Sequence, residues 1–222
     1  MCRQLGQAGV RVLVGARNPD RGAEAARLLN AEGGEAASVR MDVTDAAQVT
    51  AAAEDVARSY GRLDILVNNA GVLLPESRPS ESGAELVRQV YETNVFGVVR
   101  VTQAMLPLLR KSAGGRIVNM SSSLASLQLH GDPSFELGDF LMLGYNSSKT
   151  ALNALTVMWA KDLAEAGIKV NAADPGYCAT AMTGYASPRF AAEGARTPVR
   201  LALLPDDGPS GGLFGDNGPI PW

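Results

Sequence analysis

The chain has 222 residues, 46% of them hydrophobic and 19% charged, and a formal net charge of −3. This length suits one well-buried domain, the balanced charges exclude a basic surface for nucleic acid, and no apolar run is long enough to cross a bilayer. The chain has no secretory leader pattern, its two cysteines lie far apart, and it has a single histidine, which together predict a cytoplasmic protein without a disulfide framework or a metal site.

Short apolar runs alternate with longer helical patterns along the chain. The runs predict strands at Val10–Ala16, Glu35–Met41, Leu63–Asn68, Arg116–Met120, Lys169–Ala173 and Gly212–Phe214. The patterns between them predict helices at Asp20–Ala31, Asp45–Tyr60, Ala84–Lys111, Gly144–Ala166 and Ala191–Leu203. Such alternation predicts an α/β fold, in which helices cover both faces of a parallel sheet. No repeat or linker divides the chain, so residues 1–222 form one domain.

The first nine residues resemble the second half of a helix that ends at Gly9. A helix of two turns is too short to be stable alone. We therefore expect that a further segment precedes Met1 in the natural protein.

Small and polar residues follow several of the predicted strands. The run "ILVNNAGV" ends in Asn69-Ala70-Gly71, the run "GRIVNMSSS" ends in three serines, and "MDVTD" places Asp42 after a third strand. A fourth strand leads into Pro175-Gly176. Because ligands of open parallel sheets bind at the carboxyl ends of the strands, these residues predict a binding crevice there.

Tyr145 and Lys149 lie four residues apart on a predicted helix, so that both side chains project from one face. A lysine ammonium near a phenol favours the phenolate and lowers the pKa of the tyrosine. A tyrosine tuned in this way can give a proton to a carbonyl oxygen or take one from an alcohol. A tyrosine and a lysine exposed on a helix without any chemical role would show the same spacing. The binding crevice predicted from the strand ends favours an acid–base role for this pair.

These motifs together resemble the short-chain dehydrogenase/reductase family, and most closely its carbonyl-reductase-like members. The resemblance rests on NNAG at 68–71, Asn94 in "TNVFG", Tyr145-x-x-x-Lys149 after a serine, "PGYCAT" and the final "GPIPW". It implies a Rossmann-type, doubly wound α/β/α fold with strand order 3-2-1-4-5-6.

The resemblance also implies roles for individual residues. Tyr145 would be the general acid/base, Lys149 would tune it and hold the nicotinamide ribose, and Ser122 would bind the substrate oxygen. Asn94 would support a proton relay to the lysine, although a kink in the helix would also explain an asparagine there. The residues implied in cofactor binding are Arg17, Asp42, Val43, Asn69, Ala70, Gly71, Tyr145, Lys149, Pro175, Gly176 and Thr180.

The cofactor is expected to be NADP(H) rather than NAD(H). An NAD enzyme carries an acidic residue after its second strand to bind the adenosine ribose, whereas Ala16-Arg17 stands at that place here. A guanidinium there can pair with a 2′-phosphate. Arg17 as a solvated loop residue is the alternative.

In the expected strand order, the run at Val10–Ala16 is the second strand. The family's first strand and Gly-rich loop are therefore missing from this chain, and the neighbours of that strand would face each other across a gap. Counting the strand and loop of a βαβ unit, we expect roughly 20–25 residues before Met1.

The most favoured function is an NADPH-dependent reduction of a ketone or aldehyde. The alternatives are a non-catalytic protein that cannot hold the cofactor and an NAD-dependent alcohol dehydrogenase. Ser122 and Tyr145 are separated by an insert that we expect to cover the site. The helix after Tyr145 is apolar on more than one face, which predicts either a deeply buried helix or the interface of a homodimer.

Overall fold

The strands form two sheets in the computed structural model, which describes residues 1–222. They are β1 (Val12–Ala16), β2 (Ala36–Arg40), β3 (Ile65–Asn68), β4 (Arg116–Met120), β5 (Lys169–Ala173), β6 (Leu213–Gly215) and β7 (Gly218–Ile220). β1 pairs with β2, and the second sheet has the order β3-β4-β5-β6-β7. Every pair is parallel except β6 with β7, and β1 and β3 do not pair with each other. The expected gap thus lies between β1 and β3.

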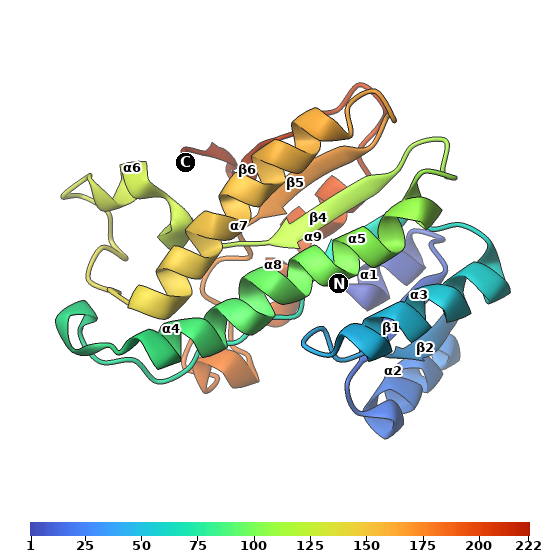
Figure 1. Ribbon diagram of the computed structural model, residues 1–222, viewed down its shortest axis with the longest axis horizontal. Coiled ribbons are helices and arrows are strands. Elements are labelled where there is room, and N and C mark those ends of the chain that lie inside the picture. The colour runs from blue at the N-terminus through green and yellow to red at the C-terminus, as the bar shows by residue number, and fades with distance from the viewer.

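Helices cover both faces of these sheets, as the alternation predicts (Figure 1). They are α1 (Cys2–Gln7), α2 (Pro19–Ala31), α3 (Ala46–Tyr60), α4 (Ala84–Tyr91), α5 (Val98–Leu109), α6 (Leu127–His130), α7 (Leu143–Asp162), α8 (Ala191–Gly194) and α9 (Arg196–Ala202). Short helical turns occur at η1 (Pro79–Glu81), η2 (Glu92–Gly97), η3 (Ser123–Ala125) and η4 (Ala181–Thr183). No helix combines the length and the apolar character that a membrane span requires.

Two apolar cores lie on opposite faces of the sheet layer, because successive strand residues point to opposite sides. The first core packs α3, α5 and α7 against the sheet and includes Leu66 and Ile117. The second packs α1, α2 and α9 against the other face and includes Val118. Side chains of β1 contact both cores, so the two sheets act as one layer despite the gap. The α/β fold with helices on both faces is therefore confirmed.

The prediction of a single α-helix over Ala84–Lys111 is wrong. It consists of α4, the π-helical turn η2 and α5, which form one long rod beside α7 (Figure 1). Asn94 sits in η2, fully buried, and bonds across to the segment after β3. The predicted helix at Ala191–Leu203 is likewise divided into α8 and α9. Gly194, the last residue of α8, packs closely on the segment that follows β5: a Cβ on Gly194 would lie 2.9 Å from the Pro175 backbone oxygen.

Candidate active site

The register of the strands brings three chain segments to one edge of the larger sheet. Asn68 pairs with Asn119, and Met120 pairs with Ala173. The segments that begin at Asn69, Ser121 and Asp174 therefore leave the carboxyl ends of neighbouring strands side by side. The first turns of α7 pack against η3, which directly follows Ser122, and this packing places Tyr145 and Lys149 at the same edge.

Lys149 is buried at the centre of this edge, with 5% of its surface exposed. Its Nζ donates a hydrogen bond to the Met120 backbone oxygen at 2.7 Å and lies 5.6 Å from the centroid of the Tyr145 ring. Burial disfavours the charged form and lowers the pKa of Lys149 to about 8. Because the ammonium has three N–H groups and one acceptor here, it has donors left for further hydroxyl groups.

Burial is also the largest cause at Tyr145, whose pKa is raised to about 12. The Asp174 carboxylate contributes to this rise, and a hydrogen bond with Ser122 opposes it. The expectation that Lys149 lowers the pKa of Tyr145 is therefore not met in this structure. Lys149 is not among the causes of the shift at Tyr145, and its own pKa of about 8 leaves the ammonium mainly protonated at neutral pH. The phenol carries its proton throughout the neutral range.

Asp174 is a titratable neighbour that the sequence analysis did not single out. Burial raises the pKa of its carboxyl group, against opposing hydrogen bonds from the Gly176 and Ser123 backbones and the Ser123 hydroxyl. The bond from the Gly176 nitrogen measures 2.9 Å, and the charge of Arg189 also lowers this pKa. The carboxyl group of Asp174 thus lies next to Ser123, the first residue of η3, and is close enough to Tyr145 to affect its pKa.

Asp174→Asn is expected to shift the pH dependence of the site to lower pH. The amide keeps an acceptor for Gly176 and removes the negative charge, so the pKa of Tyr145 falls. Tyrosinate then forms at lower pH, and alcohol oxidation, which needs it as a base, reaches its plateau earlier. Initial rates of oxidation from pH 7 to 11 measure this.

A charge-matched control is Asp55→Asn on the exposed surface of α3. Since Lys149 titrates in the same range, profiles of both variants are compared with the unmodified protein. An unshifted profile in Asp174→Asn would contradict an electrostatic effect of this carboxylate on Tyr145.

Asn94 connects three parts of the site. Its Oδ1 accepts from the Val72 backbone nitrogen at 2.8 Å, and its Nδ2 donates to the Val72 oxygen and to Ser148 Oγ, both at 3.0 Å. Gly71 lies between Asn94 and Lys149, because a Cβ on it would come within 3.4 Å of Asn94 Oδ1 and 3.5 Å of Lys149 Nζ. The structure therefore brings Asn94, Ser122, Tyr145 and Lys149 into one site.

The residues at this edge fit the nicotinamide half of a dinucleotide. Lys149 has buried donors to spare, and Asn69 and Ala70 are exposed beside it. Pro175 leads into Gly176, which has a φ of 71° that favours glycine, and Thr180 begins η4 farther along the same segment. This edge of the sheet thus combines small residues with an ammonium group that has donors for hydroxyl groups.

The residues expected near the adenine follow the smaller sheet. Asp42 Oδ1 accepts from the Thr44 nitrogen at 2.9 Å and from its hydroxyl at 2.7 Å, and these bonds lower the pKa of Asp42. Val43 packs on η2, since a Cβ on Gly97 would come 2.8 Å from Val43 Cγ2. Arg17 is exposed, and its charge also lowers the pKa of Asp42. The contact of Val43 with η2 connects this group to the turn that carries Asn94.

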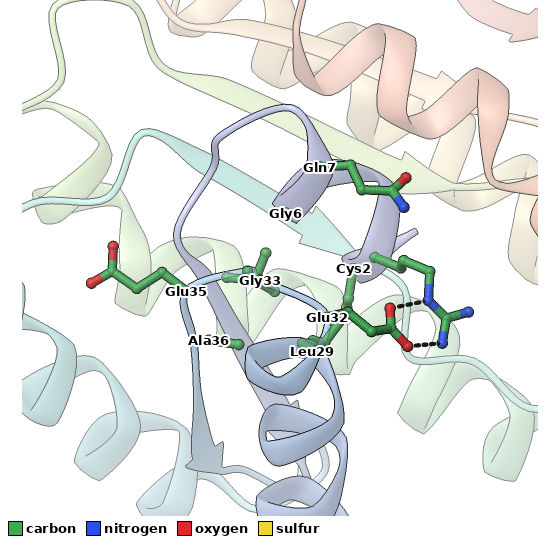
Figure 2. A pocket seen from close by; sticks show the side chains of 11 residues that line it. Cys2, Gly6, Gln7, Leu29, Glu32, Gly33, Glu35 and Ala36 are labelled. Carbon is green, nitrogen blue, oxygen red and sulfur yellow. Dashed lines mark hydrogen bonds and ion pairs between the residues drawn. The ribbon is translucent and has the colours of Figure 1, made fainter.

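A separate small hollow lies between α1, the C-terminal end of α2 and the start of β2, where Cys2, Gly6 and Leu29 are among its lining residues (Figure 2). An ion pair of Arg3 with Glu32 closes one side of it. None of the residues predicted for catalysis or cofactor binding lines this hollow.

Comparisons with known proteins agree with the geometry. The short chain dehydrogenase family model matches residues 1–189. The chain is 34% identical to a (-)-isopiperitenone reductase of Mentha piperita, over 96% of this chain and 91% of that protein. It superposes on salutaridine reductase from Papaver somniferum with a TM-score of 0.80 and 31% identity, over 97% and 94% of the two chains.

A carbonyl reductase from chicken fatty liver, solved with NADPH bound, superposes with a TM-score of 0.83 and 28% identity, over 96% of this chain and 88% of that one. The family match covers most of the chain, and the relatives are named as reductases. The fold, the edge of the sheet at which the site lies and these similarities lead to one conclusion. The chain belongs to the short-chain dehydrogenase/reductase family of oxidoreductases and is similar to its carbonyl reductases.

Proposed function

We propose that the chain is an NADPH-dependent reductase that converts a ketone or an aldehyde to an alcohol. The observation that supports this most is the arrangement around Tyr145, whose half-buried phenol is hydrogen-bonded to Ser122 and whose ring centroid lies 5.6 Å from the Nζ of the buried Lys149. A protonated phenol can act as the acid of a reduction. The similarity to reductases, one of them solved with NADPH, supports the same direction and the same cofactor.

In this proposal each side chain acts on the substrate oxygen or on the proton. The Ser122 hydroxyl donates a hydrogen bond to the carbonyl oxygen and stabilises the negative charge that develops there. Tyr145 transfers its phenolic proton to that oxygen, and Lys149, mainly protonated at neutral pH, stabilises the tyrosinate that remains. NADPH, when bound, would supply the hydride for the carbonyl carbon.

The residue after β1 favours NADPH over NAD. β1 ends at Ala16 and is followed by the exposed Arg17, with no acidic side chain at the strand end to repel a 2′-phosphate.

Thermal melting of the purified chain with NADPH, with NADH and without cofactor tests the proposal. A cofactor at a hundred times its dissociation constant stabilises the fold by about 2.7 kcal/mol. For a domain of this size, that raises the melting temperature by roughly 5–11 °C. A larger shift with NADPH, together with NADPH consumption on a panel of ketones, supports the reductase. Melting that neither cofactor shifts would favour the non-catalytic alternative.

Arg17→Ala is expected to weaken NADPH binding about 10–100-fold and to leave NADH binding unchanged, because a charge-assisted hydrogen bond to a phosphate is worth roughly 1.5–3 kcal/mol. Arg21→Ala, on the nearby exposed first turn of α2, removes the same charge as a control. Dissociation constants from titration of cofactor fluorescence measure the effect. Equal loss for both cofactors, or no loss, would contradict a role of Arg17 in recognising the 2′-phosphate.

A cytoplasmic location and a homodimer remain predictions from the sequence. Leu152 of α7 and Leu163, the C-cap residue of this helix, are buried in the chain's own structure, whereas Met158 is 63% exposed. The apolar character of this helix is thus partly explained by its packing within one chain.

A further inference from the structure

The helix that carries Tyr145 begins without a cap from its own sequence. Met142 stands at the N-cap of α7, and its side chain makes no capping hydrogen bond. The first backbone N–H groups of a helix have no partner within the helix. At α7 these groups include the amide of Tyr145 itself and the amide of Gly144 before it.

Glu76 supplies the missing acceptors from a distant part of the chain. Its Oε2 accepts from the Gly144 nitrogen at 2.7 Å, and its Oε1 accepts from the Tyr145 nitrogen at 2.9 Å. One carboxylate thus satisfies two neighbouring amides, and its negative charge lies at the positive end of a 20-residue helix. The Glu76 carboxylate packs closely against Gly144, since a Cβ on this glycine would come 3.2 Å from Glu76 Oε1.

The segment that carries Glu76 is itself fixed to the site. It leaves β3 through the small residues that end at Gly71, and Asn94 holds the next residue, Val72, by two hydrogen bonds. The segment therefore runs from the expected cofactor crevice to the first turn of α7. Through Glu76, the position of Tyr145 is linked to the same segment that Asn94 anchors.

We infer that Glu76 is a positioning residue for Tyr145: its carboxylate fixes the first turn of α7 and so sets where the phenol meets the substrate oxygen. This inference rests on the proposed reduction. Proton transfer depends steeply on geometry, and a displacement of about 1 Å can cost roughly 100-fold in rate. Glu76 touches neither of the reacting atoms, so it acts only through the backbone of Tyr145.

Glu76→Ala is expected to lower kcat for ketone reduction about 10–100-fold, with little change in the dissociation constant for NADPH. Met142→Asp in the Glu76→Ala background provides the rescue. The backbone of Met142 is extended, as an N-cap residue requires, and an aspartate there can accept from the amides of Gly144 and Tyr145. The double variant is expected to regain most of kcat. Glu85→Ala, which removes an exposed carboxylate paired with Arg88 on α4, is the control and is expected to keep full activity.

Hydrogen exchange of the Gly144 and Tyr145 amides gives a second measurement that does not depend on activity. Protection is expected to fall in Glu76→Ala and to return in the double variant. Unchanged kcat in Glu76→Ala, or lost kcat that Met142→Asp fails to restore while protection returns, would overturn the inference. If the unmodified protein reduces no ketone although the exchange results are as expected, the proposed function fails and the capping contact stands.

Discussion

Replacing Tyr145 by phenylalanine is expected to lower the rate of carbonyl reduction roughly 100–10,000-fold, the range that a positioned general acid contributes. The change removes the phenolic oxygen and keeps the half-buried ring, so the melting temperature is expected to stay nearly constant. The rate of NADPH consumption, with the ketone that the unmodified protein reduces fastest, measures the effect.

Tyr177→Phe is the matched control for this prediction. Tyr177 is 47% exposed and packs near Phe140, with 6.5 Å between the ring centroids. Loss of its hydroxyl is expected to leave kcat within a few-fold of the original value. Full activity in Tyr145→Phe would show that another group supplies the proton and would refute the assignment of this tyrosine.

Asn94→Ala is expected to destabilise the fold by about 3 kcal/mol. The change removes the partner of the backbone N–H and C=O groups of Val72, and an unsatisfied buried group costs roughly 1–3 kcal/mol. The Ser148 hydroxyl loses the donor Asn94 and keeps its own hydrogen bond to the Tyr145 oxygen. At roughly 2–4 °C for each kcal/mol, the melting temperature falls by roughly 6–12 °C. Circular dichroism during heating measures this.

Thr93→Ala, in the same π-turn, is the control, because no hydrogen bond of the Thr93 side chain holds the segment after β3. A loss of stability equal to that of Asn94→Ala would mean that the turn, rather than the asparagine bridge, carries the effect. Ketone reduction by Asn94→Ala is measured well below its melting temperature. Activity that is lost there, in a fully folded protein, supports the part in proton relay that the family resemblance implies.

The strands and the chemistry of the site follow closely from local sequence. Apolar runs predict β1 to β6, and side chains of β1 to β5 contact cores on both faces of the sheet layer. Strand ends at Asn69 and Ser121 predict the edge at which the site lies, since parallel strands share their direction. The π-turn was not predicted, because its pattern of apolar residues differs little from that of an α-helix, although a kink was one explanation for an asparagine at position 94.

The electrostatics of the site depend on burial, which a motif does not report. Tyr145 and Lys149 are neighbours as the spacing predicts, yet burial raises the pKa of the phenol and lowers that of the ammonium. Glu76 had no local signal, because it lies 68 residues before Gly144, the residue whose amide it binds. The local sequence did contain a signal for Asp174, because this polar residue directly follows the buried strand β5.

The π-turn at Glu92–Gly97 has a consequence for changes in chain length. Its bonding pattern accommodates one more residue per turn than an α-helix does. Because the wider turn absorbs the additional residue, deleting one residue, such as Phe96, would restore a regular helix with little rotation of α4 relative to α5. α4 would still pack on α7, and α5 on β3 and α3. The deletion would instead remove the local widening that carries Asn94, whose side chain bridges to Val72. A one-residue deletion in η2 should therefore leave the packing of both helices intact and weaken the asparagine bridge, whereas the exposed turn around Asp132 should tolerate changes in length with neither effect.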